Sequence, residues 1–210
     1  MKKAVCIISI GESPYRYLSL KANSKYYKYF GIDMRVIDKI PDQYKEIKPK
    51  WLSSLIFEIY PDLDFAIVQD LDILPCNFNY NILDFTLNNE LNFAKSWSRV
   101  GMKVSNAPFP FFQWNAGLFG YSRQYAPFFK EIFEYGKSDP DKFGTCDQYY
   151  INKFIGEREM YVNEIPLIFN TFYHSDMDYS KTAFCHYTFS IKTEQKLETI
   201  QKYHPKEMIS

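Results

Sequence analysis

The sequence reads Phe65-Ala66-Ile67-Val68-Gln69-Asp70-Leu71-Asp72-Ile73-Leu74-Pro75 at the end of its first third. The apolar run 65–68 predicts a strand buried on both faces. Residues two apart in an extended segment point the same way, so Asp70 and Asp72 should direct both carboxylates at one spot. Such carboxylates repel each other unless one is protonated or a cation lies between them. Because ligands of open α/β sheets bind at the carboxyl ends of the strands, we expect Mg²⁺ or Mn²⁺ here, holding a diphosphate.

Two other interpretations of the acidic pair remain open. A D-x-D sequence also occurs by chance in surface turns. A phosphatase of the DxDx[TV] type would place the pair after the first strand and a Thr or Val two positions beyond it. Here the pair follows the third strand-like run, and Leu74 occupies that position. If the two carboxylates are crowded, Asp72→Asn should leave the metal-free protein equally stable or more stable.

The segments before this stretch predict a strand, a helix and a second strand. Residues 4–10 form an apolar run, and Ser13 is positioned to cap a helix that extends to about residue 30. Gly31 ends this helix, and residues 34–38 follow as a short strand. This order favours a parallel α/β sheet with a right-handed crossover.

The rest of the chain continues the alternation of helices and strands. We expect helices at 51–60, 81–89, 124–135, 145–155 and 193–202, strands at 91–94, 115–121, 160–165 and 185–187, and a long aromatic loop at 101–114. The last helix is polar, and no repeat or linker interrupts the chain. The sequence therefore predicts a single α/β domain, residues 1–210, with a mixed, mostly parallel sheet flanked by helices.

Composition limits the class of partner and the setting. Lys+Arg and Asp+Glu balance at 25 each, so no overall charge attracts nucleic acid or an anionic membrane. No apolar stretch predicts a transmembrane segment, and the run at 4–10 is too short for a signal peptide and lacks a cleavage site. The cysteines stand apart and read as buried free thiols: Cys6, Cys76, Cys146 and Cys185. These features predict a soluble protein of a reducing, cytoplasmic setting.

Three further motifs follow the acidic pair along the chain. They are Trp114-Asn115-Ala116-Gly117-Leu118-Phe119, Asp147-Gln148-Tyr149-Tyr150-Ile151-Asn152 and Cys185-His186-Tyr187-Thr188-Phe189-Ser190-Ile191-Lys192. With the acidic pair they resemble the GT-A glycosyltransferases, especially the glycogenin and lipopolysaccharide-galactosyltransferase type, over roughly residues 4–192. The resemblance implies a Rossmann-like nucleotide-binding part at about 1–95, an acceptor and catalytic part at about 96–192, and a terminal helix at about 193–203. The chain is short for this family and has the size of small glycosyltransferase domains of large viruses. A minimal enzyme and one domain of a longer multidomain chain both stay open.

The resemblance also implies a metal centre. In it, Asp70, Asp72 and His186 would ligate Mn²⁺ or Mg²⁺, and the ion would bridge the two phosphates of the donor. A histidine nitrogen beside two carboxylates favours Mn²⁺. His174 falls in a loop and His204 in a polar tail, so His186 is the best ligand candidate, with an ordinary half-buried histidine as the alternative.

Further residues are assigned to the nucleotide-sugar donor by the same resemblance. The turn of Ser9, Gly11 and Glu12 would cradle the base and ribose of the nucleotide, and Asp38 would contact the base or the ribose. Lys50 would lie near the donor sugar. Lys192 would neutralise the leaving diphosphate. Turn or surface roles remain the alternatives for Asp38, Lys50 and Lys192. No G-x-G-x-x-G fingerprint occurs, which argues against a dinucleotide site.

The resemblance places the sugar pocket and the reaction centre in the second half of the chain. Asn115, Ala116 and Gly117 would line the pocket, or form only a bulge. Asp147 and Gln148 would lie beside the anomeric carbon, although 145–148 also fit a helix capping box. The aromatic segment 109–114 would stack on an acceptor sugar or pack on the core.

These features together predict a metal-dependent glycosyltransferase. It would move a hexose from a UDP-sugar to a carbohydrate or glycoconjugate acceptor and retain the anomeric configuration. One alternative is a sugar-nucleotide nucleotidyltransferase, which needs a glycine-rich, basic signature after the first strand, where this chain offers only Gly11. The other is a non-catalytic carbohydrate-binding or protein-binding module in which the acidic pair is structural.

Overall fold

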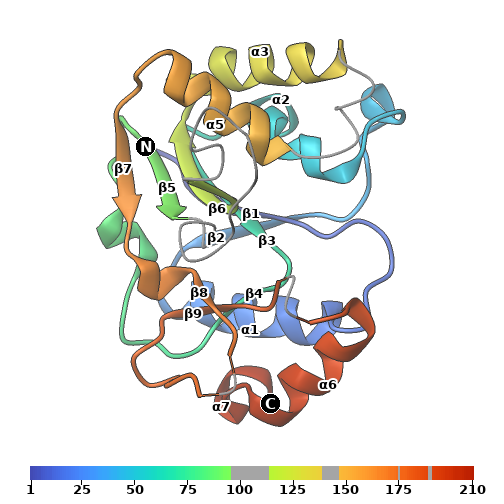
Figure 1. The fold of residues 1–210 in the computed structure, drawn as a ribbon, viewed down its shortest axis with the longest axis vertical. Helices are drawn as coiled ribbons and strands as arrows, with labels where there is room; N and C mark the ends of the chain where they lie inside the picture. Colours follow the sequence, from blue (N-terminus) through green and yellow to red (C-terminus); the bar gives the residue numbers. More distant parts are fainter. Residues whose placement is uncertain (96–113, 139–146, 175, 189–190) are drawn as a thin grey trace, which may run out of the picture.

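The computed structural model describes residues 1–95, 114–138, 147–174, 176–188 and 191–210, which fold around a six-stranded sheet (Figure 1). Its strands, in spatial order, are β2 (Asp33–Ile37), β1 (Lys3–Ile8), β3 (Phe65–Asp70), β6 (Trp114–Ser122), β5 (Leu91–Lys95) and β7 (Val162–Ile165). Neighbouring strands are parallel except at β6, which runs antiparallel to β3 and β5. The predicted mixed, mostly parallel sheet is therefore confirmed.

Helices cover both faces of this sheet. They are α1 (Arg16–Tyr29), η1 (Asp42–Tyr44), η2 (Pro49–Leu55), α2 (Ile56–Ile59), η3 (Ile82–Phe85), η5 (Arg123–Tyr125), α3 (Ala126–Lys137), α5 (Asp147–Glu157), η6 (Leu167–Phe169), α6 (Thr193–Tyr203) and α7 (Lys206–Ile209). Figure 1 shows α2, α3 and α5 above the sheet and α1, α6 and α7 below it. Each layer of helices packs against the sheet through its own apolar cluster, because strand residues alternate between the two faces of the sheet.

The first strand of a second, smaller sheet follows directly after the acidic pair. It consists of β4 (Ile73–Pro75), β9 (Phe184–His186) and β8 (Thr171–Phe172), in the order β4-β9-β8. Ile73 pairs with His186, and the amide of Tyr187 donates to the carbonyl of Asp72 at 2.9 Å. This pairing brings the late histidine beside the acidic pair.

Two expected helices differ from the structure. The predicted cap at Ser13 is wrong, because α1 begins at Arg16 after a turn in which the Ser13 carbonyl accepts the Arg16 amide at 3.0 Å. The predicted helix at 81–89 is only the short η3. The Asn92 side chain bonds both the amide and the carbonyl of Leu87, at 2.7 and 2.9 Å, and so holds that end of the segment outside a helix.

Some expectations fall on residues outside the described ranges. These are the aromatic loop at 101–113, the cap residues Thr145 and Cys146, and positions 189–190 between His186 and Lys192. Trp114 is described and begins β6, and α5 is described from Asp147.

Two details agree with the sequence analysis. Gly31, with φ +67°, ends α1 in the left-handed region that favours glycine. Cys6, Cys76 and Cys185 are buried free thiols. Among the described residues, no helix combines the length and apolarity that crossing a membrane requires.

Candidate active site

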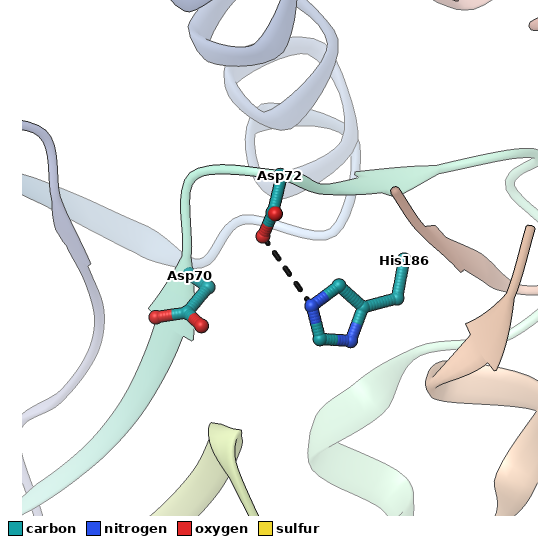
Figure 2. A group of neighbouring side chains, drawn as sticks. All are labelled: Asp70, Asp72 and His186. Atoms are coloured by element: carbon teal, nitrogen blue, oxygen red, sulfur yellow. Dashed lines mark ion pairs between the residues drawn. The ribbon is translucent and has the colours of Figure 1, made fainter. Parts of the chain in front are cut away.

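Asp70 and Asp72 lie at the carboxyl end of β3, together with His186. Asp70 is the last residue of the strand, whereas Leu71 and Asp72 form a turn into β4 rather than a continued extended segment. One ligand atom from each of the three side chains lies within 4.8 Å of the others. Figure 2 shows both carboxylates and the imidazole around one space. The extended geometry we expected is wrong, but the expected convergence of the three side chains is confirmed.

Buried polar side chains from α1 and β3 shape this turn. Asn23 and Gln69 both donate to the carbonyl of Ile73, at 3.2 and 2.7 Å, and Ser19 donates to the carbonyl of Leu71. Gln69 also donates to Asn23 at 2.7 Å, so the network is closed. Buried backbone carbonyls that lack strand partners need such donors, which explains a polar patch on the inward side of α1. Sequence analysis gave these residues no role, although the four-residue spacing of Ser19 and Asn23 places them on one helix face.

His186 presents a free ring nitrogen to the acidic pair. Its Nδ1 lies 2.8 Å from Oδ1 of Asn170, whose amide nitrogen donates to the carbonyl of Lys95 at 3.1 Å. That second bond fixes the amide, so Oδ1 accepts and Nδ1 carries a proton, which in the neutral ring leaves the lone pair on Nε2. Nε2 lies 3.3 Å from Oδ1 of Asp72. Either a proton on Nε2 or a cation between the two atoms makes this contact favourable, so these residues fit a divalent metal ion.

The two carboxylates differ in their surroundings. The side chain of Asp70 is accessible to solvent but has protein atoms close around it. Desolvation, followed by the charges of Asp72 and Asp147, raises the pKa of Asp70 well above its ordinary value. Burial would also raise the pKa of Asp72, but contacts with His186 and Lys196 outweigh it and lower that pKa. The pair thus has one carboxylate favoured as the anion and one disfavoured.

Lys196 of α6 contacts Asp72 and was missed by sequence analysis. Its Nζ lies 2.6 Å from Oδ2 of Asp72, and the residue is only 8% exposed. Sequence analysis placed it on a polar terminal helix, and that description of the helix is wrong on its inner face. The available signal was the spacing: Lys196 precedes the fully buried Ile200 by four residues and so shares its face.

Gly117 makes room for the carboxylate of Asp70. A Cβ at this position would lie 2.7 Å from Oδ2 of Asp70 and 2.7 Å from Oδ1 of Asn115. The Gly117 amide donates to the same Asn115 oxygen at 2.7 Å. The β3–β6 pairing aligns Gln69 with Leu118, so Gly117, the last residue of the Asn115-Ala116-Gly117 motif, lies beside Asp70.

Asp147 and Gln148 are the first two residues of α5, which packs against β6. Burial raises the pKa of Asp147 to about 6, and the positive charge of Lys50 opposes this rise. Gln148 accepts the Ala116 amide through Oε1 at 3.0 Å, so its side chain joins α5 to β6. Asn152 adds to this joint by accepting the Trp114 amide at 2.8 Å and donating to the Trp114 carbonyl at 2.9 Å.

The remaining expected donor residues lie at two places. Ser9 is buried at the end of β1 and donates its amide to the carbonyl of Ile37 at 2.8 Å, so the ends of β1 and β2 lie together. The other residues of this edge, Gly11, Glu12 and Asp38, are exposed. Lys192 is exposed at the start of α6, one turn before Lys196.

The predicted locations of the three histidines are correct for His174 and wrong for His204. His186 is 3% exposed and His174 is exposed in a loop. The prediction that His204 lies in a polar tail is wrong, because this residue is only 2% exposed. Its Nε2 lies 3.0 Å from the carbonyl of Pro75, and its Nδ1 lies 2.9 Å from the hydroxyl of Tyr187. Packing of the C-terminal residues under the small sheet buries it.

The overall fold is similar to those of solved glycosyltransferases. A glycosyltransferase involved in the glycosylation of the major capsid of PBCV-1 matches over 94% of this chain and 98% of its own, with a TM-score of 0.68 and 14% identity. The galactosyltransferase LgtC, solved with donor and acceptor sugar analogs, matches over 96% and 98%, with a TM-score of 0.58 and 15% identity. The apo form of GlyE from Streptococcus pneumoniae TIGR4 has a TM-score of 0.59 and 12% identity, and it matches all of this chain over 65% of its own.

No protein-family model matches the sequence, and no curated protein matches it either. The similarity therefore lies in the arrangement of the elements, a mixed sheet with helices on both faces. The chain has the GT-A-like α/β fold of these glycosyltransferases.

Proposed function

We propose that this protein is a metal-dependent glycosyltransferase that moves a hexose from a UDP-sugar to a carbohydrate or glycoconjugate acceptor. The observation that carries the proposal is the convergence of Asp70, Asp72 and His186 at the carboxyl end of β3 in a GT-A-like fold. A galactosyltransferase is among the proteins of similar fold, which supports a hexose as the transferred group.

The metal site proposed here favours Mn²⁺ over Mg²⁺. Two carboxylate oxygens and the Nε2 atom of His186 form the donor set, and imidazole suits the softer ion better. When bound, the ion would supply Lewis-acid stabilisation to the diphosphate leaving group. Lys192 would add positive charge on the side of α6.

The nucleotide would bind across the carboxyl ends of β1, β2 and β3. Ser9, Gly11 and Glu12 follow β1 and would contact base and ribose, with Asp38 following β2. This edge of the sheet carries the acidic pair, so base, diphosphate and ion would lie along one edge. A base at one end and an ion at the other would fix the orientation of the donor.

The sugar would lie between β6 and the start of α5. Asn115, Ala116 and Gly117 would line it on one side, and Asp147 and Gln148 on the other, with Lys50 near Asp147. We propose that Asp147 positions a hydroxyl of donor or acceptor, while the departing diphosphate takes the proton of the acceptor. This assignment goes with retention of the anomeric configuration.

One experiment separates this function from its alternatives. The protein is incubated with a panel of UDP-sugars, with and without Mn²⁺, and released UDP is measured. We expect metal-dependent hydrolysis of one UDP-hexose, lost in Asp72→Asn. Pyrophosphate exchange with UTP and a sugar phosphate would instead identify a nucleotidyltransferase, and sugar binding without any turnover would identify a binding module.

The stereochemistry has its own measurement. We expect NMR of the first product to show the donor's anomeric configuration, and Asp147→Asn to lose only a modest factor in turnover. An inverted product, with turnover lowered by a factor of roughly 10²–10⁴ and donor binding intact, would make Asp147 a general base instead.

We propose a reducing, cytoplasmic setting for the protein, in agreement with its three described free thiols.

A further inference from the structure

Lys196 gives the acidic site a positive charge of its own. It reaches the site from α6, with its side chain 10% exposed and its Nζ 2.6 Å from Oδ2 of Asp72. The same Nζ lies 5.5 Å from the ring centre of Tyr15, at the start of α1. The ammonium group is thus enclosed between the acidic turn and the first helix.

The contact divides the two oxygens of Asp72 between two partners. Oδ2 accepts from Lys196, and Oδ1 faces Nε2 of His186 at 3.3 Å. An ion that binds between His186 and Asp70 would therefore meet Oδ1 beside the imidazole, whereas Oδ2 is already engaged by Lys196. Asp72 would serve as a ligand through one oxygen only.

We infer that Lys196 is a positioning residue of the metal centre and makes the site prefer a metal–nucleotide complex over a free metal ion. The inference rests on the proposed function, because it takes the metal site as given. With Lys196 present, two carboxylates and a divalent ion leave one net positive charge, which a diphosphate can neutralise. Without Lys196 the same ligands neutralise the ion by themselves, so the diphosphate gains less.

The inference predicts two effects of opposite sign in Lys196→Met. Free Mn²⁺ should bind at least roughly fivefold more tightly, because a repelling charge is gone. UDP at saturating Mn²⁺ should bind at least roughly fivefold more weakly, because an attracting charge is gone. A variant that merely loosens the packing of α6 would weaken both equilibria together.

The experiment uses the whole protein and two readouts other than activity. Electron paramagnetic resonance of unbound Mn²⁺ gives the affinity for the ion without nucleotide, and calorimetry with UDP gives the affinity for nucleotide at saturating Mn²⁺. Lys202→Met is the matched control, since Lys202 lies on the same helix and is exposed. Lys196→Arg, which keeps the charge, should bind both as the wild type does.

The outcomes separate this inference from the proposed function. Opposite shifts in Lys196→Met, absent from Lys202→Met and reversed in Lys196→Arg, support the role of Lys196. Shifts equal to those of Lys202→Met, or a weakening of both equilibria, overturn it while the metal site stands. A wild-type protein that binds no Mn²⁺ with or without UDP overturns the metal site itself, and this role with it.

Discussion

His186 is held in place by Asn170, a residue outside the four motifs. The Asn170 side chain bonds Nδ1 of His186 on one side and the backbone of β5 on the other. Hydrogen bonds of this kind fix both the tautomer and the direction of a histidine ligand. At the residue scale, the candidate site therefore depends on a second layer of side chains as well as on its three ligands.

The first prediction tests this histidine. His186→Ala should weaken Mn²⁺ binding more than Mg²⁺ binding, because only the softer ion gains much from imidazole. Asn170→Ala should act in the same direction, by about 10-fold or more. Titration of both ions by calorimetry provides the measurement, and His174→Ala, in an exposed loop, is the control. Unchanged titrations for His186→Ala would leave it a structural residue.

The second prediction contrasts the two carboxylates in the metal-free protein. The sequence alone suggests that Asp72→Asn relieves repulsion, but the structure pairs Asp72 with the ammonium group of Lys196, so this substitution should lower stability by about 1–3 kcal/mol. Asp70→Asn should leave stability equal or raise it, because the Asp70 carboxylate is the disfavoured anion. Thermal unfolding in EDTA measures both. Equal losses for the two variants would contradict the asymmetry.

At the scale of elements, β6 is the strand that joins the two halves of the site. It runs antiparallel between β3 and β5, faces Asp70 with Gly117, and is bonded to α5 through Gln148 and Asn152. The sequence predicted this strand from its apolar pattern and predicted close approach at Gly117. It did not predict that the approaching group is the carboxylate of Asp70, because strand pairing is not encoded in either strand alone.

The third prediction concerns that glycine. Gly117→Ala should keep the fold but displace Asp70, since its Cβ would lie 2.7 Å from two side-chain oxygens. We expect Mn²⁺ affinity to fall at least roughly tenfold, in line with the loss of one ligand's orientation. Gly156→Ala in α5 is the control, because its Cβ meets nothing within 4 Å and should raise stability by about 0.5–1 kcal/mol. Wild-type metal affinity in Gly117→Ala would show that Asp70 tolerates the shift.

At the scale of the whole molecule, the C-terminal residues complete the site from below. α6 supplies Lys196 to the acidic pair, and α7 packs against α1 with Met208 and Ile209 buried. His204, between these helices, contacts the carbonyl of Pro75 and the hydroxyl of Tyr187 in the small sheet. The last residues are thus part of the structure that surrounds the candidate metal site.

The fourth prediction uses the burial of His204. Burial lowers the pKa of His204 to about 4. In the folded protein this imidazole is therefore protonated only at a lower pH than in the unfolded chain, where its pKa is near 6.5. A depressed folded-state pKa gives stability above pH 6.5 that is lost as the pH falls to about 4. The stability difference between wild type and His204→Asn should shrink by about 2–3 kcal/mol over that range. Urea unfolding at several pH values measures it, and a constant difference would contradict the prediction.

How much of the fold the sequence predicts depends on the range of the interactions involved. The strands at 65–70, 91–95 and 114–122 follow from local apolar patterns, and their predictions are confirmed to within a few residues. The helix at 81–89 is wrong, because Asn92 binds Leu87 from outside the segment. A pattern within one segment cannot report a competing partner that lies beyond it.

The resemblance to the GT-A glycosyltransferases added His186 to the acidic pair. The sequence by itself determined that the chain forms a mixed α/β sheet and that Asp70 and Asp72 follow a buried strand. Those conclusions depend on alternation and residue type, which are local properties. Only the tertiary structure decided that Asp72 is shared between His186 and Lys196, that Asn170 orients the imidazole, and that α6 closes the site. These contacts join residues far apart in the chain, and their partners are set by how the layers pack rather than by any spacing in the sequence.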